Sequence, residues 1–355
     1  MTRKLNFSSG PAALPEEVLR AAQVALLDLD GSGIGILEHS HRGPEFGRVL
    51  DRTEAAIREV GGIGDEFAIL FVTAGATHHF SMIPDSFLGA GQMADHCDTG
   101  TWSQKAIEEG RRVGTVHVAC SGGPAYRAIP TLLAFSAAPR YVHYTSNETI
   151  HGVQWSAPPV APGPLVCDAS SDLFSRPLAL DNHALIYAGA QKNLGPSGIS
   201  LVIARKEFVA TESAGRPPLA QYGTYVAERS LHNTPSTFGI FVIGEVVRWI
   251  AARGGLAAMA ERNERKARIL YDFLDHSTAW RGHAEPASRS RMNVTFRGAT
   301  PQLETTLLAR AEAAGLSGLA GHRSIGGLRA SIYNAFPEAG VTRLVQLLDD
   351  VEHGR

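Results

Sequence analysis

The sequence predicts an α/β protein of two domains: a large domain on a mostly parallel sheet covered by helices, and a smaller α+β domain at the C-terminal end. Three observations predict it. The chain of 355 residues is too long for one simple core. Strand-like and helix-like stretches alternate along most of the chain before residue 260, which is typical of a parallel sheet. From residue 283 onward short strands mix with helices, which indicates a separate core.

The predicted elements begin with an extended arm, residues 6–15, rich in Ser, Gly and Pro. Pro15, Glu16 and Glu17 then open a helix, because Pro and acidic residues are favoured in a first turn. Residues 237–252 and 256–275 form two helices, the second of which is expected to bridge the domains. The other expected strands are 67–73, 113–119, 141–144, 165–168, 184–188, 199–204, 292–296 and 327–333, and the other helices are 45–60, 102–110, 301–314 and 341–353.

The composition argues against several classes of function. No run approaches the roughly 20 continuous apolar residues of a membrane span, and the first residues lack a signal-peptide pattern, so the cytoplasm is expected. A formal charge of −2 gives no basic footprint for nucleic acid. Cys97, Cys120 and Cys167 show neither paired nor metal-ligand spacing, so no disulfide framework and no metal site are expected.

Lys192 is the candidate nucleophile. It follows the strand-like run 184–188 and precedes a Gly/Pro-rich turn and another apolar strand. A lysine taken alone is better explained as a solvated surface residue. At this strand end, however, burial would lower the pKa of the amine and make it nucleophilic, as a carbonyl-trapping lysine requires.

Asp168 is the candidate partner of Lys192. It ends the buried-type strand 165–168, and in isolation it is better explained as a cap of the following helix. Ligands collect at the carboxyl ends of strands in open parallel sheets, and Lys192 ends the next strand-like run. A buried carboxylate paired with a pyridine nitrogen keeps that ring protonated, so that it can accept electrons.

Two further segments fit a phosphorylated aromatic cofactor. The turn Ala74–Thr77 joins a strand to a helix, whose N-terminal N–H groups can bind phosphate, although plain strand-to-helix connections look the same. Trp102 follows Gly100 and is equally consistent with a core residue or with a flat surface stacked on a ring.

Basic residues cluster near both ends of the chain. His41-Arg42 and His322-Arg323 are followed by Arg329 near the C-terminal end. One such pair is ordinarily a solvated surface feature. Together, in a chain with no basic excess, they predict a pocket for a substrate with two anionic groups, since the guanidinium fork binds carboxylate or phosphate bidentately.

Taken together, these motifs resemble the phosphoserine aminotransferase family, which are class V, fold-type I enzymes that use pyridoxal phosphate (PLP). The resemblance runs from residue 5 to the last helix. It implies a seven-stranded type of sheet, an arm (1–15), a large PLP-binding domain (16–260), a small domain (261–355) and a homodimer with shared active sites. The motifs that carry it are Asn6-Phe-Ser-Ser-Gly-Pro-Ala, Ser40-His-Arg-Gly, Asn147-Glu-Thr, Asp168-Ala-Ser-Ser, Ser175-Arg-Pro, Tyr187-Ala-Gly-Ala-Gln-Lys-Asn, Asn233-Thr-Pro, Ser290-Arg-Met-Asn-Val and Gly321-His-Arg followed by Gly326-Gly-Leu-Arg-Ala-Ser-Ile-Tyr.

The resemblance also implies a role for each site residue. Lys192 would hold the cofactor as a Schiff base and Asp168 would pair with the pyridine nitrogen. Trp102 would stack on the ring and Thr149 would bind the ring hydroxyl. The cofactor phosphate would be held by Ala76, Thr77 and Gln191, and by Asn233 and Thr234 of a second subunit; the substrate would be held by Ser9, His41, Arg42, His322, Arg323 and Arg329, with Arg329 on its α-carboxylate.

One departure concerns the turn before the helix at residue 76. Some members of the family carry an arginine in a Gly-Gly-Gly-Arg turn where this chain has Thr77. Cofactor-phosphate binding should survive, because it depends on backbone N–H groups, but one cation for the substrate phosphate is missing. Either His78 or His79 could replace it, or either could be a core histidine.

The implied reaction is a ping-pong transamination between L-glutamate and 3-phosphohydroxypyruvate, giving O-phospho-L-serine and 2-oxoglutarate in serine biosynthesis. A phosphorylated four-carbon acid on the route to vitamin B6 is a second possible substrate. Three rivals remain. An alanine– or serine–glyoxylate transaminase would need a neutral pocket, and a desulfurase-type lyase would need a cysteine after Cys167. A non-catalytic phosphate-binding module lacks the G-x-x-x-x-G-K-[ST] run and leaves Lys192 and Asp168 unexplained.

Overall fold

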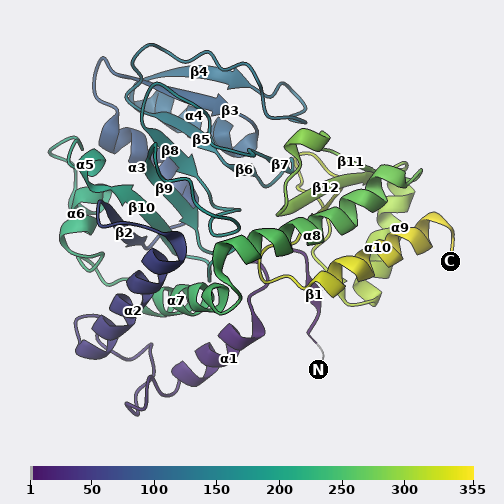
Figure 1. The fold of residues 1–355 in the computed structure, drawn as a ribbon, viewed down its shortest axis with the longest axis horizontal. Coiled ribbons are helices and arrows are strands. Elements are labelled where there is room, and N and C mark those ends of the chain that lie inside the picture. Colours follow the sequence, from purple (N-terminus) through teal and green to yellow (C-terminus); the bar gives the residue numbers. More distant parts are fainter. Residues whose placement is uncertain (1–2) are drawn as a thin grey trace.

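A seven-stranded sheet forms the centre of the large domain in the computed structural model, which describes residues 3–355 (Figure 1). Four of its neighbouring strand pairs are parallel, and only β10 runs antiparallel to its neighbours. The expected mostly parallel α/β sheet is therefore confirmed. In spatial order the strands are β2 (Phe67–Val72), β10 (Ser200–Arg205), β9 (His183–Gly189), β8 (Leu165–Asp168), β5 (Val142–Thr145), β3 (Met93–Asp98) and β4 (Thr115–Ser121).

Helices cover both faces of this sheet. Along β2, Phe67, Ile69 and Phe71 enter one core, whereas Leu70 and its alternate neighbours enter the other. A strand that is buried on both faces reads as a continuous apolar run, which explains the sequence pattern. The helices of this domain are α1 (Glu16–Ala25), α2 (Pro44–Gly61), α3 (Ala76–Phe87), α4 (Thr101–Val113), α5 (Lys206–Val209), α6 (Tyr222–Ala227) and α7 (Thr237–Ala251), with a 3₁₀ turn at Pro218–Ala220.

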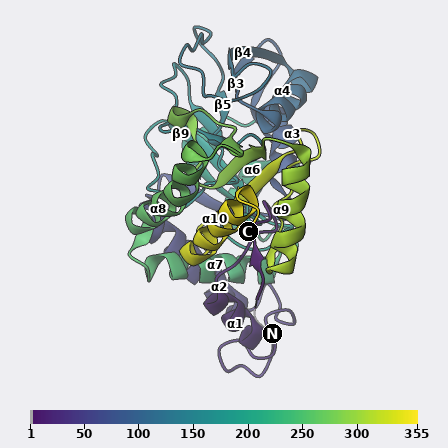
Figure 2. The same cartoon turned by 90° about the vertical axis from the view of Figure 1, so that its right-hand side faces the viewer.

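Helix α8 (Gly255–His276) runs from the large domain into the smaller one (Figure 1). Its Met259 belongs to the core of the large domain, and its Leu270 and Leu274 belong to a second core. Figure 2 shows α10 between α8 and α9 in this smaller body. Its elements are β11 (Trp280–Gly282), β12 (Asn293–Gly298), β14 (Leu328–Ser331), α9 (Pro301–Ala313), α10 (Glu338–Glu352) and the 3₁₀ turn Pro286–Ser288.

The N-terminal arm joins the smaller body. Strand β1 (Leu5–Asn6) pairs in parallel with β13 (Leu316–Ser317). Phe7 is buried and lies 4.3 Å from Phe336, measured between ring centroids. The arm is therefore anchored at its start and then passes toward the large domain, where the backbone N–H of Ala12 donates to the carbonyl of Gln191 (2.9 Å).

Two expectations about elements were wrong. Strand β3 was not predicted, because its sequence Met-Ala-Asp-His-Cys-Asp is polar. Its polar side chains are buried in the fold: Asp95 accepts from the N–H of Ser136 (2.7 Å), whereas His96 stacks on His143 and neither of its ring nitrogens has a hydrogen-bond partner among the described residues. Helix α4 continues to Val113, so β4 starts two residues later than expected. Among residues 3–355, no helix is long and apolar enough to span a membrane.

Candidate active site

Lys192 lies in the turn between β9 and β10. The turn is clamped at its base, where the N–H of Ala190 donates to the carbonyl of Ile199 (2.9 Å). The Nζ of Lys192 donates to Oγ1 of Thr149 (2.7 Å) and lies 5.6 Å from the ring centre of Trp102. Burial lowers the pKa of Lys192, and the nearby carboxylates of Asp168 and Glu148 oppose that shift.

Asp168 ends β8, beside the end of β9, and its side chain is almost fully buried. Its Oδ1 accepts hydrogen bonds from the N–H (2.9 Å) and the hydroxyl (2.5 Å) of Ser170. No donor within residues 3–355 reaches Oδ2, so that oxygen is free for a ligand. Burial raises the pKa of Asp168, while Lys192 and the Ser170 hydrogen bonds lower it.

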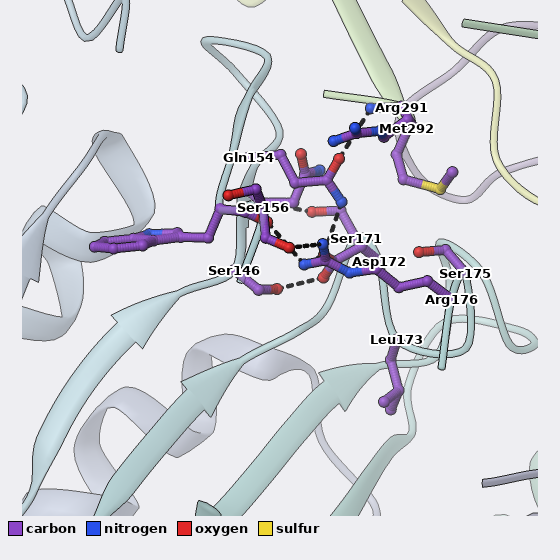
Figure 3. A network of polar contacts seen from close by, with 12 residues as sticks. Ser146, Gln154, Ser156, Ser171, Asp172, Leu173, Ser175, Arg176, Arg291 and Met292 are labelled. Carbon is purple, nitrogen blue, oxygen red and sulfur yellow. Dashed lines mark hydrogen bonds and ion pairs between the residues drawn. The ribbon is translucent and has the colours of Figure 1, made fainter. Parts of the chain in front are cut away.

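The loop after Asp168 is held by a polar network (Figure 3). Asp172 accepts hydrogen bonds from Ser146 and from Nε2 of Gln154 (3.0 Å), and it pairs with Arg176 at 3.5 Å. Arg176 also donates to the carbonyl of Ser156 (2.8 Å). These contacts fix the loop that starts at Asp168, so the carboxylate is presented by a rigid segment.

Trp102 and the start of α3 provide two further surfaces. Trp102 is the second residue of α4, and its buried Nε1 has no partner among the described residues. Helix α3 begins at Ala76, so the N–H groups of Ala76 and Thr77 have no acceptor within the helix. Oε1 of Gln191 is likewise buried without a partner among residues 3–355. Free N–H groups at a helix start suit a phosphate.

Arg329 marks the side toward the small domain. It projects from β14, is mostly buried, and donates to Oγ of Ser9 (2.7 Å) and to the carbonyl of Thr149 (3.4 Å). The hydroxyl of Tyr333 donates to the carbonyl of Ser9 (2.8 Å). The arm, the small domain and the Thr149 segment therefore converge on one guanidinium group.

Among residues 3–355, the remaining predicted site residues form few hydrogen bonds through their side chains. Within the described chain, no hydrogen bond joins their side chains to Lys192, Asp168 or Arg329. His322 contacts Ser324 (2.7 Å), and burial together with Arg329 and Arg323 lowers its pKa below 6.5. His322 therefore gives up its proton more readily than a free imidazole does. This group comprises His41, Arg42, Asn233, Thr234, His322 and Arg323.

The two histidines after Thr77 differ. His79 is fully buried between the hydroxyls of Tyr222 (2.8 Å) and Ser200 (2.7 Å), and burial lowers its pKa to about 3. It is a core histidine and does not replace the missing cation. His78 is exposed in the first turn of α3.

Glu148 is a further residue of the site, and no sequence pattern singled it out. Its carboxylate is completely buried and accepts from the N–H groups of Trp102 (3.1 Å) and Ser103 (2.9 Å). The available signal was its place beside Thr149 in the Asn147-Glu-Thr motif. Its partners lie 45 and 46 residues away, so no local pattern could identify them.

Comparison with known proteins agrees with this geometry. The model of the family "Aminotransferase class-V" matches residues 4–344. The phosphoserine aminotransferase of Herpetosiphon aurantiacus is 47% identical over 97% of each chain. The solved phosphoserine aminotransferase from Bacillus circulans subsp. alkalophilus is 44% identical, with a TM-score of 0.97 over 99% of each chain.

A second solved structure is described as PLP-bound phosphoserine aminotransferase from Trichomonas vaginalis. It is 34% identical, with a TM-score of 0.93 over 98% of this chain and 100% of that one. An alanine–glyoxylate aminotransferase from Nostoc, at 18% identity, shares the fold alone. The resemblance seen in the sequence motifs is confirmed, and the chain belongs to the class V aminotransferases and, within them, to the phosphoserine aminotransferase family.

Proposed function

We propose that this chain is a PLP-dependent aminotransferase that exchanges the amino group of L-glutamate with 3-phosphohydroxypyruvate, giving O-phospho-L-serine and 2-oxoglutarate. The observation that carries this is the convergence of a half-buried lysine, a buried carboxylate and an aromatic ring. Lys192 contacts Thr149 and faces Trp102, and its pKa responds to Asp168.

The free groups of the site fit the cofactor. Oδ2 of Asp168 suits a protonated pyridine nitrogen, and the N–H groups of Ala76 and Thr77 suit the phosphate. Gln191 would join them through the NH2 group of its amide, because an amide oxygen cannot donate to a phosphate. Thr149 suits the ring hydroxyl. When bound, PLP supplies a carbonyl carbon that exchanges amino groups and a ring that accepts electrons.

The chain's own residues then have distinct tasks. Lys192 would hold the cofactor covalently, and its free amine would move the proton at the substrate Cα, for which a lowered pKa suits it. Asp168 keeps the ring protonated. Trp102 orients the ring by stacking. Arg329, preoriented by Ser9, binds the α-carboxylate that both amino-acid substrates share.

His41, Arg42, His322 and Arg323 bind the second anionic group, a phosphate or a side-chain carboxylate. A phosphorylated four-carbon acid of the vitamin B6 route would use the same groups. The alternative, an alanine– or serine–glyoxylate transaminase, would be disfavoured by burying these groups against an uncharged side chain.

We also propose a cytoplasmic homodimer, in which Asn233 and Thr234 reach the cofactor phosphate of the partner subunit. Two observations support it: neither side chain bonds to the site of its own chain in the described part, and α1 with the following segment exposes apolar side chains. Figure 2 shows α1 at the lower end of the molecule. The exposed side chains are Leu19, Val24, Leu26, Leu27, Ile34 and Leu37.

Mixed dimers test the shared site. Lys192→Ala and Asn233→Ala subunits, each weakly active alone, are unfolded and refolded together. If Asn233 serves the partner's site, random pairing restores about a quarter of the wild-type activity, because half of the dimers then contain one intact site. Activity no higher than the sum of the parents would contradict sharing.

The substrate is tested by the visible spectrum of the PLP-loaded protein during separate additions of O-phospho-L-serine, L-glutamate, L-alanine, L-serine and the phosphorylated four-carbon amino acid. We expect the first two to convert the bound cofactor and L-alanine and L-serine to do so weakly. If alanine or serine reacts as fast as phosphoserine, the alternative transaminase is correct. If the four-carbon amino acid converts the bound cofactor and O-phospho-L-serine does not, the substrate belongs to vitamin B6 synthesis.

A further inference from the structure

The start of helix α4 is capped from another part of the chain. Its cap position is Gly100, which has no side chain to accept the free N–H groups of the first turn. Glu148 in β6 (Asn147–Glu148) accepts two of them, from Trp102 (3.1 Å) and Ser103 (2.9 Å). A carboxylate is favoured there by the helix dipole.

Glycine is required at position 100 by this arrangement. A Cβ atom on Gly100 would lie 2.5 Å from Cδ of Glu148, closer than real contacts allow. The hydroxyl of Ser103 accepts from the N–H of Gly100 (2.9 Å), so the turn before α4 is also held. The side chain that would cap α4 locally is therefore absent at position 100 because the carboxylate of Glu148 occupies that space.

The segment that carries Glu148 also carries groups of the site. Thr149 follows it and contacts Lys192 (2.7 Å), while Asn147 donates to Oδ1 of Asn293 in β12 (2.8 Å). β6 pairs with β7 (Val153–Gln154), which completes a short hairpin. Glu148 therefore ties the element that presents Thr149 to the element that presents Trp102.

We propose that Glu148 is a positioning residue that fixes the Trp102 ring relative to Thr149 and Lys192, so that the cofactor ring enters a preformed slot. This rests on the proposed PLP function. Burial raises the pKa of Glu148 to about 7 despite the hydrogen bonds from Ser103 and Trp102, and Asp168 adds to the rise. Retaining so costly a carboxylate suits a positional task better than a purely stabilising one.

The rival explanation is an ordinary helix cap that contributes stability only. The chain offers a matched control for it. Glu212 accepts from the N–H groups of Tyr222 (2.7 Å) and Gly223 (2.9 Å) at the start of α6. This is the same two-bond cap from a distant carboxylate, but α6 carries none of the predicted site residues.

The experiment compares Glu148→Gln with Glu212→Gln in the PLP-loaded protein. The readouts are the dissociation constant of PLP and the circular dichroism of the bound cofactor in its visible band, which reports the asymmetry imposed on the ring. We expect Glu148→Gln to weaken PLP binding about tenfold and to reduce the band, because one charge-assisted hydrogen bond is lost. Glu212→Gln should change neither by more than about twofold.

A double-mutant cycle shows whether Glu148 acts through Trp102. In a Trp102→Leu background, Glu148→Gln should weaken PLP binding less than about twofold further, since the ring to be positioned is gone. Gly100→Ala, which crowds the carboxylate without removing it, should repeat the loss and keeps the test decisive if Glu148→Gln folds poorly. Additive losses, or a cofactor band unchanged in both Glu148→Gln and Gly100→Ala, would overturn the inference.

The two proposals fail in different ways. If the wild-type protein binds PLP but does not respond to phosphoserine, the proposed substrate is wrong, whereas the cofactor measurements still decide the role of Glu148. If the wild type responds normally and the cycle is additive, only the positioning role is refuted.

Discussion

The ring-binding half of the site and its anion-binding half are built differently. Lys192, Asp168 and Thr149 are buried or half-buried and are held by hydrogen bonds within one chain. Arg42 and Arg323 are exposed, and neither side chain has a partner in the described structure. The ring-binding side chains are therefore held in place before a ligand arrives, whereas Arg42 and Arg323 present their charges to a ligand that has still to bind.

This difference separates two requirements. A group that must hold a shifted pKa has to be desolvated and fixed before the ligand arrives, which only a folded core can do. A group that captures a phosphate can remain solvated until the substrate arrives, because the anion itself supplies the partner. Substitutions in the first half should therefore affect chemistry, and those in the second should affect substrate affinity.

The largest effect is expected for Lys192→Ala. It removes both the covalent anchor and the proton-moving amine, so single-turnover conversion by phosphoserine should fall by about a thousandfold or more. Lys206→Ala, at an exposed lysine in α5, is the matched control and should be near wild type. Near-normal turnover in Lys192→Ala would refute the assignment of Lys192 as covalent anchor and proton-moving amine, on which the ring-binding half depends.

Asp168→Asn comes next. The amide oxygen can still accept from Ser170, so folding and PLP binding should persist. Loss of the charge that keeps the ring protonated should lower kcat by about a hundredfold, with KM changed little. The check is steady-state kinetics together with PLP affinity. A variant that loses PLP but turns over normally when saturated would assign Asp168 to anchoring alone.

The ring-binding half was readable from the sequence for a physical reason. Lys192 and Asp168 follow or end apolar runs that form neighbouring parallel strands. Because the carboxyl ends of parallel strands lie at the same edge of a sheet, these two local patterns were enough to predict that the two side chains lie close together. The pattern of apolar runs also located six of the seven strands of this sheet. It missed β3, whose Asp95 and His96 are buried by contacts with residues distant in sequence.

Contacts between residues that are distant in the sequence could not be predicted from the sequence. Glu148 caps a helix that begins about 45 residues away in sequence, and the pKa of His322 is lowered by burial and by Arg329 and Arg323. The sequence contained these residues and their charges, but it did not contain the distances between them.

Arg323→Ala should have a smaller and more selective effect than either change above. It removes one exposed cation, so KM for O-phospho-L-serine should rise about tenfold while PLP affinity and kcat stay close to wild type. The slow reaction with L-alanine provides the internal control and should not change. An equal loss for alanine and phosphoserine would place Arg323 in the ring-binding half.

The last expected effect concerns stability instead of activity, and it links the two halves of the comparison through Glu148. Its pKa near 7 in the fold lies above the ordinary 4.5, so the folded state holds the proton more tightly. Between pH 4.5 and 7 the unfolded chain is already ionised, and the stability of the apo protein should fall with rising pH by roughly 3 kcal/mol at most from this group.

Glu148→Gln removes that slope. In denaturant unfolding of the apo protein, the stability of the wild type relative to Glu148→Gln should therefore decrease from pH 5 to pH 8. The control variant Glu212→Gln, which replaces the carboxylate that caps α6, should keep the wild-type slope. Equal slopes in all three proteins would mean that Glu148 is ionised without cost. If the buried charge of Glu148 costs stability and still sets the position of Trp102, Glu148 belongs with the residues of the ring-binding half, which folding fixes before the ligand binds.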